Sequence, residues 1–156
     1  MIRYCFTFPN TEKAFRISDE IFGLVVDTVD ADVLERQRMK LILSELFMNA
    51  YIHGNKSDPA KNVDVLIEIE GDDFTATVKD QGEGIAKERF KEMVQSISNP
   101  EDESGRGITI VHKLSDKVQL YKDKDDKFCI RAIRKIEKQE PAAKKRPGKR
   151  SKVEAM

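Results

Sequence analysis

The sequence has no tryptophan, only two histidines and two cysteines among its 156 residues, and no long apolar run. The two cysteines, Cys5 and Cys129, lie far apart and lack the paired spacing of a zinc site or a disulfide framework. No segment approaches the roughly 18 consecutive apolar residues of a membrane helix, and the N-terminus lacks a signal-peptide pattern. We therefore expect a soluble, cytoplasmic protein with no membrane attachment and two buried, free thiols.

The formal net charge is zero, but the charge is unevenly distributed. Residues 137–156 hold seven Lys or Arg and three Glu, so this segment carries +4 and residues 1–136 carry −4. The segment has no apolar run, so burial cannot offset its ordering entropy, and we expect a disordered basic tail after one domain at 1–136. Such a tail can contact nucleic acid or an acidic partner, although a simply solvated end is the favoured interpretation.

The hydrophobic pattern predicts the element order β–α–α–β–β–α–α–β–β. Alternating or β-rich segments predict strands, and apolar residues at helical spacing predict helices. Asn10 or Thr11 is the expected cap of the first helix. Residues 98–106 are expected to form a mobile loop. Paired strands beside helices indicate an α+β two-layer sandwich with a mixed, mostly antiparallel sheet. The expected strands are 2–8, 63–69, 74–78, 118–121 and 128–136, and the later expected helices are 32–54, 86–97 and 108–114.

A polar stripe follows one side of the helix expected over 32–54. Glu45, Asn49 and His53 are four residues apart, which places them on one face. An amide oxygen such as that of Asn49 suits Mg²⁺, which binds substrate phosphates with few protein ligands, and a carboxylate one turn away can accept a proton from a hydroxyl or water. Taken alone, this pattern also fits a solvated helix face, and His53 alone fits a polar cap.

An acidic, glycine-rich turn ends the strand expected over 74–78. Asp80 precedes Gly82 and Gly84, which permit a tight turn and the close approach of a base, and a carboxylate there can accept the exocyclic amino group of adenine. By itself, Asp-x-Gly-x-Gly is a common turn, and Glu83 is expected to face solvent.

A third glycine-rich segment precedes the short helix expected over 108–114. Gly105 and Gly107 expose backbone amides next to a helix N-terminus, which favours a phosphate. The segment has neither the Walker A pattern nor the dinucleotide fingerprint. Arg106 is as consistent with a phosphate contact as with a solvated side chain, and Thr109 either reaches a phosphate oxygen or caps the helix.

Together, in this order, the three blocks resemble the N, G1 and G2 boxes of the GHKL (Bergerat-fold) ATPases, and most of all the anti-sigma factor serine kinases of the switch-protein type. The resemblance covers roughly residues 5–135, and the short interval between the second and third blocks favours this branch over sensor histidine kinases. It rests on Glu45-x-x-x-Asn49-Ala50-x-x-His53-Gly54, Asp80-x-Gly82-x-Gly84-Ile85 and Gly105-Arg106-Gly107-Ile108.

The resemblance implies ATP and Mg²⁺ as cofactors and a role for each matching residue. Glu45 would activate an acceptor serine, Asn49 would hold Mg²⁺, and Asp80 would read adenine. It also implies partner switching, in which the protein holds a sigma factor or other regulator until a STAS-domain antagonist competes, and inactivates that antagonist by phosphorylating a serine. The remaining implied nucleotide-binding residues are His53, Gly82, Gly84, Ile85, Gly105, Arg106, Gly107, Ile108 and Thr109.

Three other functions remain open at this level: a regulator-binding module without phosphotransfer, a detached catalytic domain of the histidine-kinase type, and nucleic-acid binding through the tail. Intact Glu45 argues against the first. A homodimer is also expected, from the resemblance and because the first strand and helix carry more apolar surface than a small domain needs to bury. That surface consists of Phe6, Phe8, Phe15 and Phe22.

Overall fold

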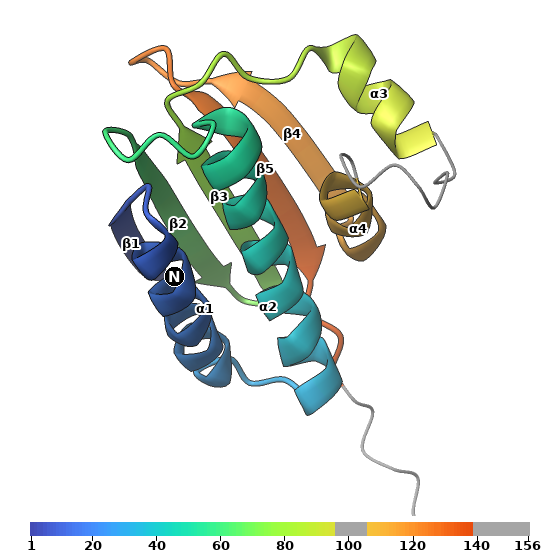
Figure 1. Ribbon diagram of the computed structural model, residues 1–156. Coiled ribbons are helices and arrows are strands. Elements are labelled where there is room, and N and C mark those ends of the chain that lie inside the picture. The colour runs from blue at the N-terminus through green and yellow to red at the C-terminus, as the bar shows by residue number, and fades with distance from the viewer. Residues whose placement is uncertain (96–105, 139–156) are drawn as a thin grey trace, which may run out of the picture.

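A computed structural model describes residues 1–95 and 106–138. Its elements follow the expected order (Figure 1), and a tight turn at Gly71, which has φ +59°, joins β2 to β3. The strands are β1 (Ile2–Pro9), β2 (Asn62–Glu70), β3 (Asp73–Asp80), β4 (Lys117–Lys122) and β5 (Phe128–Lys135), and the helices are α1 (Glu12–Asp27), α2 (Val33–Met48), the π-helical η1 (Asn49–Gly54), α3 (Lys87–Gln95) and α4 (Arg106–Leu114).

The five strands form one sheet in the order β1-β2-β3-β5-β4, and all four pairings are antiparallel. The α+β class is confirmed, but the expected parallel pairing is absent from the described strands. The reason is topological. The helical excursion through α3 and α4 brings β4 back in the same direction as β3, but β5 then inserts between these two strands and runs antiparallel to both.

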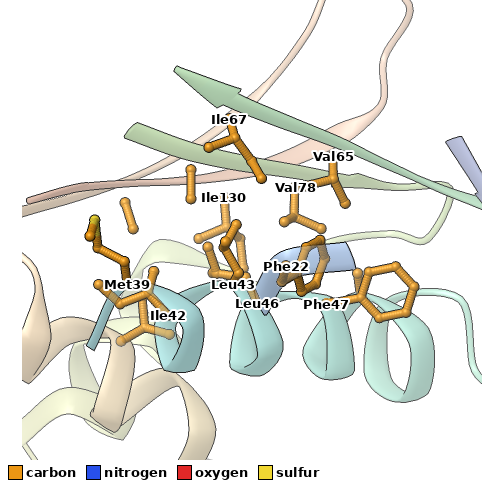
Figure 2. Close-up of a cluster of buried hydrophobic side chains, with 14 of the residues drawn as sticks. Phe22, Met39, Ile42, Leu43, Leu46, Phe47, Val65, Ile67, Val78 and Ile130 are labelled. Atoms are coloured by element: carbon orange, nitrogen blue, oxygen red, sulfur yellow. The ribbon is translucent and has the colours of Figure 1, made fainter. Parts of the chain in front are cut away.

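Helices α1, α2 and α4 cover one face of the sheet (Figure 1), and the core lies between the two layers. The alternation in β2 sends Val63, Val65 and Ile67 into this core, where they are at most 2% exposed. Figure 2 shows the side chains of α2 meeting those of the sheet, with Phe22 of α1 beside Phe47. Two stacked layers around one core are the solution expected for amphipathic helices beside a half-buried sheet.

The phenylalanines of β1 and α1 pack in the core of the domain and do not form an exposed apolar surface. Phe8 and Phe22 are buried, Phe6 and Phe15 pack partly buried against the same core, and the Phe8 and Phe47 rings meet edge to face at 5.2 Å between centroids. The argument for a homodimer from these four side chains is therefore wrong, because the intramolecular core already uses them.

One of the two thiols differs from expectation. Cys129 is buried, whereas Cys5 is exposed. Cys5 pairs with Leu66 in the register and alternates with Phe6, so it lies on the sheet face that the helices leave uncovered. In the described part of the chain, no helix is long and apolar enough to cross a membrane.

The helix expected over 32–54 is α-helical only to Met48. From Asn49 to Gly54 the backbone winds as a π-helix, and the amide of Asn55 donates to the carbonyl of Ala50 at 2.7 Å. Such wide turns occur most often at functional sites, where they reposition side chains. Of the two residues expected to cap the first helix, Thr11 does so and Asn10 does not. The hydroxyl of Thr11 accepts a hydrogen bond from the backbone amide of Ala14.

A buried ion pair joins the opposite end of α2 to β5 and α4. Arg134 donates from Nε to Glu35 Oε1 at 2.7 Å, from Nη2 to Glu35 Oε2 at 2.8 Å, and from Nη1 to the carbonyl of Leu114. Burial alone would raise the pKa of Glu35, but the hydrogen bonds and charge of Arg134, helped by Arg38, outweigh it and lower that pKa. This pair fixes α2 relative to α4.

Candidate functional site

A cavity of about 610 Å³ lies beside the end of α2, and its size is within the range of small-molecule sites. Residues from α2, η1, the turn after β3, α3 and α4 line it, so segments far apart in the sequence meet here. The lining residues are Glu45, Met48, Asn49, His53, Gly84, Ile85, Ala86, Arg89, Met93, Arg106, Gly107, Ile108 and Ile110.

The three members of the polar stripe on α2 and η1 all line this cavity. Asn49 is 8% exposed, and His53 is exposed at the rim. Glu45 is half-buried, and burial raises the pKa of its carboxyl group. A carboxylate held in this way is a stronger proton acceptor than one in water, which is the property required of a general base.

The glycine at the start of α4 lies directly against the Glu45 carboxylate. A Cβ atom built at Gly107 would overlap Glu45 Oε2, so a larger residue here would displace the carboxylate. The flanking residues Arg106 and Ile108 also line the cavity, and Ile108 is 2% exposed. Gly105 lies outside the described residues.

Thr109, proposed above as a phosphate contact or helix cap, does not line the cavity. Its hydroxyl donates to the carbonyl of Met93 at 3.1 Å and so ties α4 to α3. Thr109 therefore joins the two helices that form this side of the cavity wall.

Asp80 ends β3 in a buried position, 3% exposed, and does not itself line the cavity. Burial raises the pKa of its carboxyl group, although the Gly82 amide, which donates to Oδ1 at 2.8 Å, and the charge of Lys61 oppose this. A Cβ atom at Gly54 would overlap the Asp80 carboxyl group. The carboxylate is therefore held between the end of η1 and the turn that leads into the cavity wall.

The two glycines of this turn serve different purposes. Gly82 packs against the Gly54 carbonyl, where a Cβ atom would overlap backbone. Gly84 has φ +86°, a conformation that favours glycine, and lies on the Phe128 ring. Gly84 and the following Ile85 line the cavity, whereas Gly82 does not.

Sequence reasoning gave no role to two polar residues at or beside the site. Asn55, to which it gave no role, is fully buried: its side-chain amide donates to the carbonyl of Asn62 at 2.9 Å, and its side-chain oxygen accepts a hydrogen bond from the backbone amide of Gln81 at 2.8 Å. Asn55 thereby fastens the end of η1 to β2 and β3 beside Asp80. Arg89 of α3 lines the cavity, and no motif in the sequence indicated it.

The donor set at the cavity fits a magnesium–phosphate group. Within residues 1–95 and 106–138 there is no cluster of three or more acidic, histidine or cysteine side chains that could hold a metal alone. Among the described residues that line the cavity, Asn49 and Glu45 have side-chain oxygens that can bind a metal ion. Mg²⁺ bound to substrate phosphates and water needs only one or two protein ligands of this kind.

Comparison with known proteins identifies relatives over most of the chain. The family model of the histidine kinase-like ATPase domain matches residues 14–134. The anti-sigma F factor of Anoxybacillus flavithermus is 32% identical over 116 residues, which are 72% of this chain and 78% of that protein. An anti-sigma F factor of Clostridium perfringens is 34% identical over 100 residues, or 62% and 70% of the two chains.

A solved structure has the same fold. A chain in the crystal structure of the SiaB–SiaC complex from Pseudomonas aeruginosa matches with a TM-score of 0.55 and 15% identity, and the match covers 83% of this chain and 89% of that chain. At this identity the likeness concerns the fold alone.

Proposed function

Since this chain belongs to the family of histidine kinase-like ATPase domains and to its anti-sigma F factor branch, we propose that it is an ATP-dependent protein serine kinase. The observation that carries the proposal is one cavity that Glu45 and Asn49 both line, with the Glu45 carboxylate against Gly107 at the start of α4. The family match supports an ATP-dependent reaction, and the geometry of the cavity supports this choice of residues.

The residues have separate roles in this mechanism. Asn49 and the backbone amides at the start of α4 would hold the phosphates with their magnesium ion, and Asp80 would accept a hydrogen bond from adenine. Bound Mg²⁺ supplies charge neutralisation at the phosphates. Glu45 takes the proton of the acceptor serine hydroxyl as that oxygen bonds to the terminal phosphorus and the bond to ADP breaks.

The partners follow from the same proposal. The named relatives are anti-sigma F factors, and the neighbouring structure is a two-protein complex. We propose a sigma factor or similar regulator as the sequestered target and a STAS-domain antagonist as the phosphorylated partner, in the cytoplasm. A homodimer remains part of the proposal and would use surface other than the buried phenylalanines.

The decisive test is ATP binding by calorimetry with and without Mg²⁺, followed by transfer to candidate STAS-domain proteins that co-purify with the chain. Magnesium-dependent binding and an acid-stable phosphoserine on the partner support the proposal. An acid-labile product would indicate histidine phosphorylation, and ATP binding without any transfer would indicate a regulatory binding module.

The basic tail is tested separately. Deletion of residues 137–156 should leave ATP binding and transfer unchanged. Salt-dependent DNA binding that disappears with the tail would add a nucleic-acid role, which the described domain does not require.

A further inference from the structure

Arg89 is an arginine at the cavity for which the described structure provides no internal partner. It is exposed and lines the cavity from α3, and among residues 1–95 and 106–138 its side chain makes no hydrogen bond or ion pair. The described arginines away from the cavity all donate to, or stack on, another group: Arg3, Arg16, Arg36, Arg38, Arg131 and Arg134.

The position of Arg89 is set by the packing of its helix. Phe90 and Met93 of α3 are partly buried against the hydrophobic core. The hydroxyl of Thr109 donates a hydrogen bond to the Met93 carbonyl. In the first turn of α3, the backbone amide of Phe90 donates to the carbonyl of Ala86. Since α3 contacts α4 along this side, Arg89 and Arg106 reach the same cavity from two neighbouring helices.

The charge of the cavity wall favours an anion. Among the lining residues in the described ranges, Glu45 is the one acidic side chain, whereas Arg89 and Arg106 are both basic. A guanidinium group binds phosphate oxygens through paired hydrogen bonds, which makes arginine well suited to phosphate recognition.

We propose that Arg89 is a phosphate-binding residue that reads the polyphosphate chain of the nucleotide from the α3 side of the cavity. The assignment rests on the proposed function in that it names the nucleotide as the bound anion. Together with Asn49 and the start of α4, Arg89 would thereby favour nucleoside polyphosphates over nucleosides, a selectivity that the adenine contact at Asp80 does not provide.

The test compares Arg89→Ala with Lys91→Ala, a matched control two residues along the same exposed helix and away from the cavity. Affinities of the full chain for ATP, adenosine and inorganic tripolyphosphate are measured with Mg²⁺ held constant. Loss of one charge-assisted contact should weaken ATP and tripolyphosphate about tenfold in Arg89→Ala and leave adenosine within about twofold. Arg89→Lys should recover part of the loss, and Lys91→Ala should match the wild type for all three ligands.

The proposal is overturned if Arg89→Ala binds ATP and tripolyphosphate like the wild type, or if it loses adenosine affinity to the same extent. Because alanine is a good helix former at this exposed position, an unchanged thermal transition confirms that the variant is folded. A wild-type chain that binds neither ATP nor adenosine would refute the proposed function, and the tripolyphosphate comparison would still decide whether Arg89 binds phosphate.

Discussion

The carboxylate of Glu45 lies on the backbone of Gly107, so that a Cβ atom at residue 107 would overlap Oε2. This contact joins the last turn of α2 to the first turn of α4. It places the proposed base beside the backbone amides that are expected to hold the phosphates. The position thus requires glycine because of a neighbouring side chain, not because of its own backbone angles.

Gly107→Ala should therefore impair catalysis more than nucleotide binding. The added methyl group would displace the Glu45 carboxylate, and a misplacement of about 1 Å can cost on the order of a hundredfold in rate. Transfer rates at saturating ATP, with affinities from calorimetry, measure the two effects separately. Gly23→Ala is the matched control, since its nearest neighbours are Lys40 side-chain atoms at 3.9 Å and helical alanine is favoured. Equal transfer rates in the two variants would contradict the assigned contact.

Phosphotransfer should depend on pH through Glu45. Burial raises the pKa of this carboxyl group, and only its ionised form accepts a proton, so the rate should rise with pH and level off above that raised pKa. Glu45→Gln should reduce transfer by about a hundredfold or more while ATP still binds. The measurement is single-turnover transfer from acidic to neutral pH at saturating ATP. If the residual rate of Glu45→Gln had the same pH dependence as the wild-type rate, a group other than Glu45 would be responsible for that dependence.

Asp80→Asn should lower ATP affinity and raise stability. Losing a charged acceptor for adenine costs roughly 1–3 kcal/mol of binding free energy.

The effect on stability follows from the pKa of Asp80. This pKa is raised in the folded state, so Asp80 stays protonated to a higher pH in the folded chain than in the unfolded chain. Wild-type stability therefore falls with rising pH between the unfolded and folded pKa values, and the neutral amide removes this loss. Urea unfolding at acidic and neutral pH measures the difference in stability between Asp80→Asn and the wild type. A variant less stable than the wild type at neutral pH would contradict the predicted gain.

Removing one partner of the buried ion pair should be costly. Arg134→Met leaves Glu35, 1% exposed, without its main partner, and losses of about 3–5 kcal/mol are typical for such a change. Arg3→Met is the control. It removes the surface ion pair between Arg3 and Glu68, which should contribute less than about 1 kcal/mol to stability.

The pH dependence of this loss identifies its cause. In the wild type the lowered pKa of Glu35 gives stability at neutral pH that is lost as pH falls. Without Arg134, burial favours protonated Glu35, so the deficit of Arg134→Met measured by urea unfolding should shrink toward acidic pH. A deficit that stays constant with pH would indicate lost packing alone.

The sequence by itself determined the element order, the α+β class and the family, because periodic apolar residues and short polar blocks are local signals. It placed Glu45, Asn49 and His53 on one face, and they do share one cavity wall. It could not place Thr109 or Arg89, because the direction of each side chain depends on how α3 packs against α4.

Only the tertiary structure decided the remaining features. The all-antiparallel sheet follows from the insertion of β5 between β3 and β4, a pairing between segments that local patterns cannot order. The same holds for the π-helical turn, which Asn55 secures through bonds to Asn62 and Gln81, and for the ion pair of Glu35 with Arg134, 99 residues apart. These features depend on which distant groups become buried together, and burial is a property of the assembled layers.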